Sequence, residues 1–273
     1  MSIKIGNPKI PGIPNPHSDS ESEFPTTEDS NCLKLMGNLN VSQKFISLTY
    51  IDIDRIDNEG ISSDDRVLWI HGWRCNENIF SLQSYSLREY ITLNATYIRA
   101  PFSAIGPPDP LIAQFFPNQS YYEWFYKVSE TNDAIYNSII DETKSLKDSI
   151  LCISEFLKTR SYKVLIGFSQ GCFVITKLLH YYQHHNLKTP FNKVVLICGV
   201  APILKQGDLS MINKINIPSL HIQGTNDPFY HRSKELEDLY TVPIVVTSSE
   251  AHNIPSKLKH LDIYEQVKEF CHS

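Results

Sequence analysis

The sequence predicts an α/β fold in which a mostly parallel central sheet is flanked by helices on both faces. Short apolar runs recur along the chain, and such runs are typical of strands that are buried on both faces. Amphipathic segments separate these runs, as the crossover connections of a parallel sheet require. With 273 residues and 41% hydrophobic content, the chain is long enough to form one large core.

The strands are predicted from two kinds of pattern. Residues 44–57 alternate apolar and polar side chains and are followed by the turn sequence NEG, which is typical of a half-buried strand at the edge of a sheet. Six further runs are almost wholly apolar and predict buried strands. These runs are 66–70, 96–100, 163–168, 193–199, 218–224 and 243–247.

The helices between the strands are predicted from apolar residues at helical spacing. Leu146, Ile150, Ile153 and Leu157 fall on one face of a helix, and a similar stripe follows Ser169. These two stripes predict helices that pack on the sheet.

Residues 101–130 interrupt this alternation, because they are rich in proline and aromatic residues and have no clean period. A long aromatic loop in a compact α/β protein often forms a lid or the wall of a pocket. Its aromatic side chains are equally consistent with an apolar substrate pocket and with a cover over the edge of the sheet. They are Phe115, Phe116, Tyr121, Tyr122, Trp124 and Phe125.

The N-terminal segment differs in composition from the rest of the chain. Residues 1–31 are rich in proline, serine and acidic residues, so they offer too little apolar surface to offset the entropy cost of ordering. We expect a largely disordered tail over residues 1–40 and one α/β domain over 41–273.

Charge and cysteine spacing limit the partners of the protein. A net charge of -5, with scattered basic residues, does not favour nucleic acid binding. The sequence contains neither an apolar run long enough to span a membrane nor a signal-peptide core, so we expect a cytoplasmic protein.

The cysteines lack zinc-ligand spacing, and no metal site is expected. They are Cys32, Cys75, Cys152, Cys172, Cys198 and Cys271.

The sequence GFSQG, residues 167–171, lies where a predicted strand gives way to a predicted helix. In a G-x-S-x-G turn the glycines let strand and helix approach closely, and the serine hydroxyl projects at the carboxyl edge of the sheet. The start of the following helix also directs free N–H groups and its positive dipole end toward that hydroxyl. This context favours Ser169 as a catalytic nucleophile over a structural turn residue.

A nucleophilic serine needs a base, and the base needs a partner that fixes its tautomer. Asp227 follows the strand 218–224, and His252 follows the strand 243–247, which is the order expected for an acid and a base. Each signal alone is weak, because Asp227 also suits an ordinary turn and His252 an exposed loop. Glu250 is the rival acid and His231 the rival base.

The oxyanion of the reaction needs two backbone donors. The N–H of Gln170 follows the nucleophile, and the N–H of Trp73 lies in the loop after the first buried strand. We interpret His71 as a packed residue of that loop. Cys75 and Cys172 flank the predicted site, and small buried packing residues are their expected identity.

Several motifs together resemble the FSH1 family of serine hydrolases, over about residues 65–270. The motifs are LWIHGWRCNENIF, APFSAIGPPDP, YYEWF, KVLIGFSQGC, GTNDPF and AHNIP. The resemblance implies an α/β-hydrolase fold, esterase activity on acyl esters, and the roles of nucleophile, acid and base for Ser169, Asp227 and His252. The sequence departs from the family pattern at Cys75 and Cys172, where a glutamine and a small residue are usual.

A third departure is Ala251, where the family usually has a glycine before the histidine. Together the three departures concern the shape of the pocket and the pose of His252.

The segment GFSQG also looks like that of acyl-protein thioesterases, so a thioester substrate is an alternative to an ester. A less favoured alternative is a binding protein on a hydrolase fold, although no member of the predicted triad is missing. We expect a small-molecule ester or thioester as substrate and neither a cofactor nor a metal. The oligomeric state is left open.

Overall fold

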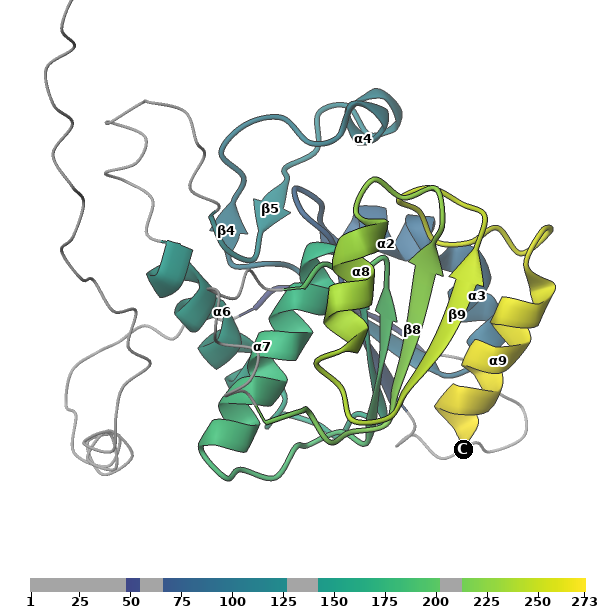
Figure 1. Cartoon of the computed structure of the whole chain (residues 1–273). Coiled ribbons are helices and arrows are strands. Elements are labelled where there is room, and N and C mark those ends of the chain that lie inside the picture. Colours follow the sequence, from purple (N-terminus) through teal and green to yellow (C-terminus); the bar gives the residue numbers. More distant parts are fainter. Residues whose placement is uncertain (1–47, 55–65, 127–141, 202–212) are drawn as a thin grey trace, which may run out of the picture. The chain divides into compact units, whose positions relative to one another are not determined.

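A seven-stranded sheet forms the centre of the described part of the protein (Figure 1). The computed structural model describes residues 48–54, 66–126, 142–201 and 213–273, and the predicted tail over residues 1–40 lies outside these ranges. The strands have the order β1-β3-β2-β6-β7-β8-β9, and β1 pairs with β3 in the antiparallel direction while the other neighbours are parallel. The strands are β1 (Tyr50–Ile53), β2 (Arg66–Ile70), β3 (Asn94–Ile98), β6 (Val164–Phe168), β7 (Lys193–Ile197), β8 (Ser219–Gly224) and β9 (Pro243–Ser248).

The central strands are apolar along their length because both faces of the sheet are covered. In β2, Leu68 and Ile70 belong to one buried cluster, whereas Val67 and Trp69 belong to the cluster on the opposite face. This alternation follows from the two-residue period of a strand. The predicted mostly parallel sheet is confirmed, and β1 is the edge strand that the pattern over residues 44–57 predicted.

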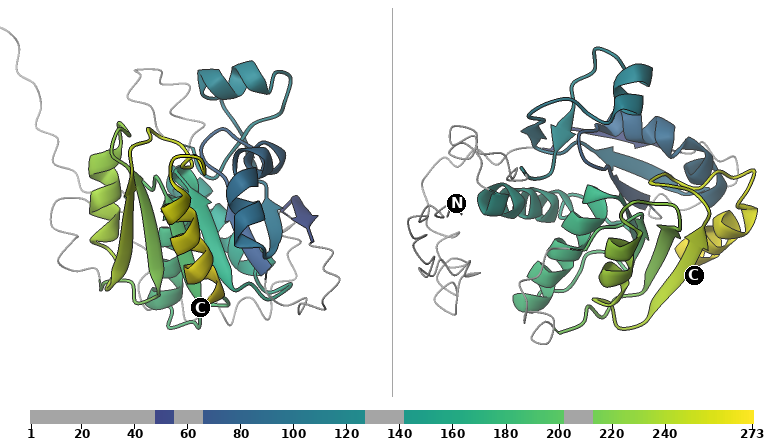
Figure 2. Two further views of the ribbon diagram at one scale, coloured as in Figure 1. Left: turned by 90° about the vertical axis from the view of Figure 1, so that its right-hand side faces the viewer. Right: turned by 45° about the horizontal axis from the view of Figure 1, so that its top comes forward.

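Among the described residues, three helices cover each face of the sheet (Figure 2). The helices α6 (Glu142–Phe156), α7 (Gln170–His184) and α8 (Tyr230–Glu237) contribute to the buried cluster on one face. The helices α2 (Glu77–Gln83), α3 (Tyr85–Ile91) and α9 (Leu261–His272) contribute to the cluster on the other. This layered arrangement is the α/β fold predicted from the sequence.

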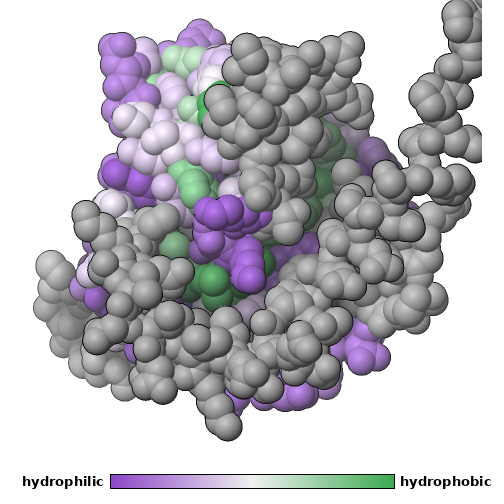
Figure 3. Space-filling model, turned by 90° about the vertical axis from the view of Figure 1, so that its left-hand side faces the viewer, coloured by the Kyte–Doolittle hydropathy of each residue, from purple (hydrophilic) through white to green (hydrophobic). Residues whose placement is uncertain are grey.

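The helices α6 and α7 carry the two predicted apolar stripes. Ile150, Ile153 and Leu157 belong to the buried cluster on their face of the sheet, and Leu146 packs against it. Figure 3 shows the side of the domain on which α6 lies in Figure 1, where hydrophilic and hydrophobic surface adjoin among the described residues. None of the helices in the described ranges is both long enough and apolar enough to cross a membrane.

The described part of the aromatic segment, residues 101–126, forms a small substructure of its own. The two-residue strands β4 (Phe102–Ser103) and β5 (Tyr122–Glu123) pair in the antiparallel direction, and α4 (Pro110–Phe115) lies between them in the chain. Asp109 caps α4 by accepting the Leu111 N–H at 2.8 Å, and Pro110 occupies its first turn. In Figure 1, α4 lies beyond the end of the sheet toward which β8 and β9 point.

Candidate active site

Ser169 lies at the turn between β6 and α7, in a backbone conformation that few residues with a Cβ adopt. Its φ is 52° and its ψ is -115°, which places it in a sparsely populated region. Its own N–H donates to the Ile197 carbonyl at 3.0 Å, and its carbonyl accepts the Cys172 N–H at 3.0 Å. These bonds to β7 and to the first turn of α7 hold the strained residue in place.

Two glycines permit this turn, as the motif GFSQG predicted. A Cβ on Gly171 would lie 2.2 Å from the carbonyl oxygen of Ile70, and a Cβ on Gly167 would lie 2.7 Å from Ile175 Cδ1. Real Cβ atoms do not come so close to other atoms. The absence of side chains at these positions therefore lets α7 begin directly against β2.

The structure brings Ser169, His252 and Asp227 together in one chain of hydrogen bonds. His252 Nε2 lies 2.8 Å from Ser169 Oγ, and His252 Nδ1 lies 2.7 Å from Asp227 Oδ2. A carboxylate only accepts hydrogen bonds, so Nδ1 carries the proton and Nε2 is free to accept the serine proton. This is the arrangement that the order of the three motifs predicted.

Asp227 is held by its own turn. Its side chain is fully buried, and Oδ1 accepts the Phe229 N–H at 2.7 Å. The His252 side chain is 26% exposed, and its ring packs between the rings of Phe168 and Phe229 at centroid distances of 5.1 and 5.3 Å. Burial of the carboxylate and the packing of the imidazole against these two rings together fix the direction of the Nδ1–H bond.

The turn with Asp227 and the loop with His252 are packed directly on each other. A Cβ on Gly224, at the end of β8, would lie 2.5 Å from the carbonyl oxygen of Ala251. Asn226 Nδ2 donates to the Ser249 carbonyl at 2.7 Å. The unusual alanine before the histidine therefore contributes its carbonyl to this contact.

The rival acid and base have other surroundings. Glu250 Oε1 lies 3.3 Å from Lys259 Nζ and 3.7 Å from His260 Nε2. His231 is an exposed residue in the first turn of α8. Neither is part of the hydrogen-bond chain to Ser169.

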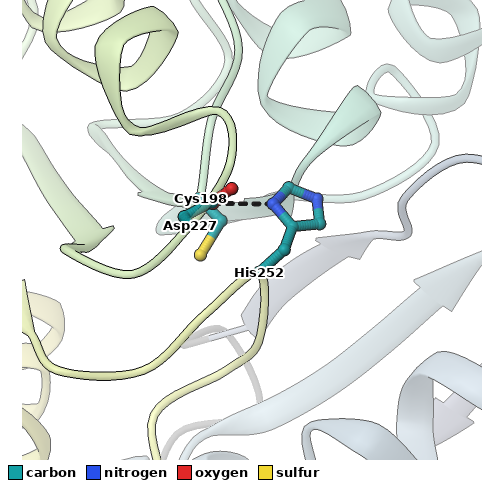
Figure 4. Close-up of side chains that lie close together, drawn as sticks. All are labelled: Cys198, Asp227 and His252. Atoms are coloured by element: carbon teal, nitrogen blue, oxygen red, sulfur yellow. Dashed lines mark hydrogen bonds and ion pairs between the residues drawn. The ribbon is translucent and has the colours of Figure 1, made fainter.

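Cys198 lies beside these hydrogen-bonded residues, and the sequence did not indicate this position. Its Sγ, a carboxylate oxygen of Asp227 and a ring nitrogen of His252 all lie within 4.8 Å of one another, and atoms of these kinds can bind a metal ion (Figure 4). Burial, and after it the charge of Asp227, raises the pKa of the thiol to about 12. The thiol is therefore protonated, and it donates to the Asn253 carbonyl at 3.4 Å, whereas metal ligation would require the thiolate.

The loop after β2 lies against Ser169. A Cβ on Gly72 would be 3.4 Å from Ser169 Cβ, so the backbone of this loop passes beside the serine. Gln170 is the first residue of α7, and the first N–H groups of a helix have no partner within the helix. The side chain of Gln170 binds elsewhere, because its Oε1 accepts the Trp124 N–H at 3.1 Å and its Nε2 donates to the Phe125 carbonyl at 3.2 Å.

His71 has the surroundings of a packed loop residue. It is completely buried, and burial lowers its pKa to about 4, so its ring is neutral. Nε2 accepts the Ala100 N–H at 3.0 Å, and Nδ1 donates to the Gly72 carbonyl at 2.7 Å. The ring thereby ties the loop after β2 to the end of β3.

The flanking thiols, Cys75 and Cys172, are both buried in the structure. Burial raises the pKa of Cys75 to about 12 and raises that of Cys172 well above its ordinary value. Both are therefore protonated at neutral pH and poor nucleophiles.

The six aromatic residues proposed for a pocket have different surroundings. Trp124 and Phe125 belong to the buried core, with exposures of 0% and 6%, which corresponds to the alternative of a core cover. Phe116, Tyr121 and Tyr122 are partly buried and pack against the two core clusters. Phe115 on α4 is 70% exposed.

Trp124 has a contact that its sequence position did not predict. Its Nε1 donates to the His71 carbonyl at 2.9 Å, and the two rings pack at a centroid distance of 5.2 Å. The only signal in the sequence was a tryptophan within an aromatic loop. The sequence did not indicate that its hydrogen-bond acceptor would be His71, which lies 53 positions earlier.

A mostly parallel sheet with helices on both faces, and a serine in a strained strand-to-helix turn, defines an α/β hydrolase. The model of the family "Serine hydrolase (FSH1)" matches residues 61–264, and the chain belongs to this family. The resemblance seen in the sequence is thereby confirmed.

Relatives and solved structures point to the same class. The chain is 28% identical to the esterase mlcF of Penicillium citrinum over 232 residues, which cover 75% of this chain and 88% of that protein. It is 27% identical to the dihydromonacolin L-[lovastatin nonaketide synthase] thioesterase of Aspergillus terreus, over 75% of this chain and 91% of that protein. The fold is similar to that of a Bacillus cereus carboxylesterase, with a TM-score of 0.56 at 18% identity over 88% of this chain and 97% of that one.

Proposed function

We propose that this ester hydrolase of the FSH1 family cleaves acyl esters through a covalent acyl-enzyme, with Ser169 as nucleophile, His252 as base and Asp227 as acid. The observation that supports this most strongly is the continuous chain of hydrogen bonds, 2.8 Å from serine to histidine and 2.7 Å from histidine to aspartate. A serine hydroxyl becomes nucleophilic only with such a base, and the base keeps its tautomer only with such an acid.

The reaction proceeds in two steps that use the same residues. Ser169 Oγ attacks the ester carbonyl while His252 Nε2 takes its proton, and the oxyanion is held by the N–H groups of Gln170 and Trp73. His252 then gives the proton to the leaving alcohol, and the acyl group remains on Ser169. Water, activated by His252, attacks the acyl-enzyme and releases the carboxylic acid.

A thioester is the second candidate substrate. The triad acts on the acyl carbon, so the same residues would expel a thiol in place of an alcohol. The Aspergillus terreus relative, which is named as a thioesterase, supports this candidate. We propose a small-molecule acyl ester as the principal substrate, because several relatives are named esterases.

We also propose that the protein acts in the cytoplasm. The described cysteines are free thiols, which fits a reducing compartment. They are Cys75, Cys152, Cys172, Cys198 and Cys271.

The test is a series of p-nitrophenyl esters from acetate to palmitate, with an acyl-thioester series in parallel, for the wild type and Ser169→Ala. We expect turnover of esters by the wild type, with the optimum chain length reporting the size of the acyl pocket. The variant should lose activity by about 10⁶-fold, since removal of the nucleophile leaves only binding and oxyanion stabilisation. Equal turnover by the variant would refute the role of Ser169, and turnover of thioesters alone would favour the second candidate.

A further inference from the structure

The guanidinium of Arg74 is enclosed next to the loop that passes beside the nucleophile. Its side chain is only 13% exposed, and Nε donates to Glu123 Oε1 at 2.8 Å. The two terminal nitrogens donate to the carbonyls of Pro107 at 2.8 Å and Ile105 at 2.5 Å. Arg74 Cζ lies 4.0 Å from the ring centroid of Trp73. Each nitrogen of the guanidinium therefore has a partner.

The segment that binds Arg74 also holds both ends of this loop. Cys75 and Tyr122 exchange two backbone hydrogen bonds, of 3.3 and 2.8 Å, and Trp124 Nε1 donates to the His71 carbonyl. Glu123, which lies between Tyr122 and Trp124, is 2% exposed. Three consecutive residues of this segment thus contact positions 71, 74 and 75.

The turn before α4 is shaped around the same guanidinium. Gly106 has a φ of +115°, and a Cβ there would lie 2.8 Å from an Arg74 nitrogen. The Ile105 N–H donates to Glu123 Oε1 at 3.2 Å, so one carboxylate receives both the turn and the arginine. Arg74 therefore joins the turn that leads into α4 to the loop beside Ser169.

The backbone of Arg74 needs these contacts. Its φ is 49°, in the left-handed region that is unfavourable for a residue with a Cβ. Such a conformation persists only where the surroundings over-determine it, and here the side chain supplies three hydrogen bonds. The residue before Arg74 is Trp73. The N–H of Trp73, which belongs to the peptide between Gly72 and Trp73, is the second proposed oxyanion donor.

We propose that Arg74 is a positioning residue for the reaction. By binding Glu123 and the 105–107 turn, it holds the peptide between Gly72 and Trp73, and with it the Trp73 N–H, toward Ser169. This proposal rests on the proposed function. Without the guanidinium the backbone at position 74 relaxes, and the Trp73 N–H no longer points at the developing oxyanion. The donor acts mainly in the transition state, so its misplacement lowers kcat and changes KM little.

The test compares Arg74→Lys and Arg74→Ala with the matched variants Arg66→Lys and Arg66→Ala. Arg66 is a suitable control because its side chain is 12% exposed and pairs with Asp52 and Asp54 at the other end of β2. The substrate is p-nitrophenyl acetate, whose short acyl group limits effects from the aromatic segment. Each kcat is expressed per active site titrated with a fluorophosphonate, so that unfolded protein does not count.

We expect Arg74→Lys to lower kcat per active site by roughly 10- to 100-fold, with KM within about threefold of the wild type. Arg74→Ala should lose more, and added guanidinium ion at millimolar concentration should restore part of its kcat. The Arg66 variants should keep the wild-type kcat. Glu123→Gln, which removes the charge of the acceptor, should lower kcat in the same way as Arg74→Lys.

An unchanged kcat per active site in both Arg74 variants, or an equal loss in the Arg66 variants, would overturn the positioning role and leave the proposed function intact. If Arg74→Ala does not fold, Arg74→Lys and Glu123→Gln still decide between the outcomes. A wild-type protein with neither ester turnover nor fluorophosphonate labelling would instead refute the proposed function itself.

Discussion

At the scale of single residues, the proposed reaction depends on one buried carboxylate. Asp227 Oδ2 lies 2.7 Å from His252 Nδ1 in a fully buried position. An amide in its place could present an N–H to the ring and favour the wrong tautomer. The acid is therefore expected to matter through the proton on Nδ1 rather than through its bulk.

Asp227→Asn should lower kcat for p-nitrophenyl esters by roughly 10⁴-fold, by analogy with the same exchange in other triads. Its matched control is Glu250→Gln, because Glu250 is the neighbouring acid and pairs with Lys259. The control should keep kcat within about twofold of the wild type. A larger loss in Glu250→Gln than in Asp227→Asn would identify Glu250 as the acid.

The residues of the candidate site differ in how far the sequence predicts them. Ser169, Asp227 and His252 each follow a recognisable strand, so their order along the chain already brings them to one edge of the sheet. Cys198 and Arg74 gave no such signal, since their contacts are made with loops far away in the sequence. Contacts of this kind follow from tertiary packing and not from local pattern.

The surroundings of His180 in α7 could not be predicted from the sequence. Burial lowers its pKa to about 4. Its Nε2 is shielded from solvent. Helical spacing alone does not reveal whether another segment covers the polar side of a helix.

At the scale of elements, the junction between β6 and α7 is the critical feature. Helix propensity alone predicts that Gly171→Ala stabilises α7 by about 1 kcal/mol. The structure predicts the opposite sign, because the new Cβ would lie 2.2 Å from the Ile70 carbonyl oxygen. A backbone atom cannot move aside as a flexible side chain can.

Gly171→Ala should therefore lower the free energy of unfolding by about 3 kcal/mol or more, as expected for overpacking against a rigid neighbour. Urea denaturation followed by circular dichroism measures this change. Esterase activity should fall as well, since α7 and Ser169 would be displaced from β2. A variant at least as stable as the wild type would show that the turn tolerates a side chain and would contradict the packing described for it.

Elements with a strong period were predicted well, and short ones were not. The sheet and the helices α6 and α7 follow from their apolar patterns. The strand predicted at 96–100 begins at Asn94, because polar residues at its start gave no apolar signal. Helix α4 and the β4–β5 pair lie within the segment that was predicted only as a loop, and elements of six and two residues are too short to show a period.

At the scale of the whole molecule, stability should depend on pH through buried histidines. Burial lowers the pKa values of His71, His180 and His221 to about 4, against 6.5 for an unperturbed histidine. The unfolded chain therefore binds protons at these positions at a higher pH than the folded chain does. These histidines do not affect the free energy of unfolding above about pH 6.5. They lower it as the pH drops from there to about 4, and their effect is constant below about pH 4.

The expected loss is on the order of 1–3 kcal/mol for each fully buried histidine. Urea unfolding at pH 7, 6, 5 and 4 measures it, and His221→Gln should reduce the dependence because it removes one titrating group. His221 suits this test, since its ring contacts Ser219 and Tyr240 and lies outside the site. Equal slopes for the variant and the wild type would show that His221 is not kept neutral by the fold.

Covalent labelling tests most directly whether Ser169 is an activated nucleophile, as we propose. The protein is treated with a fluorophosphonate, and the adduct is located by mass spectrometry of its peptides. We expect one adduct on the peptide with Ser169, and none in Ser169→Ala. An unlabelled wild type, or equal labelling of the variant, would show that Ser169 is not an activated nucleophile.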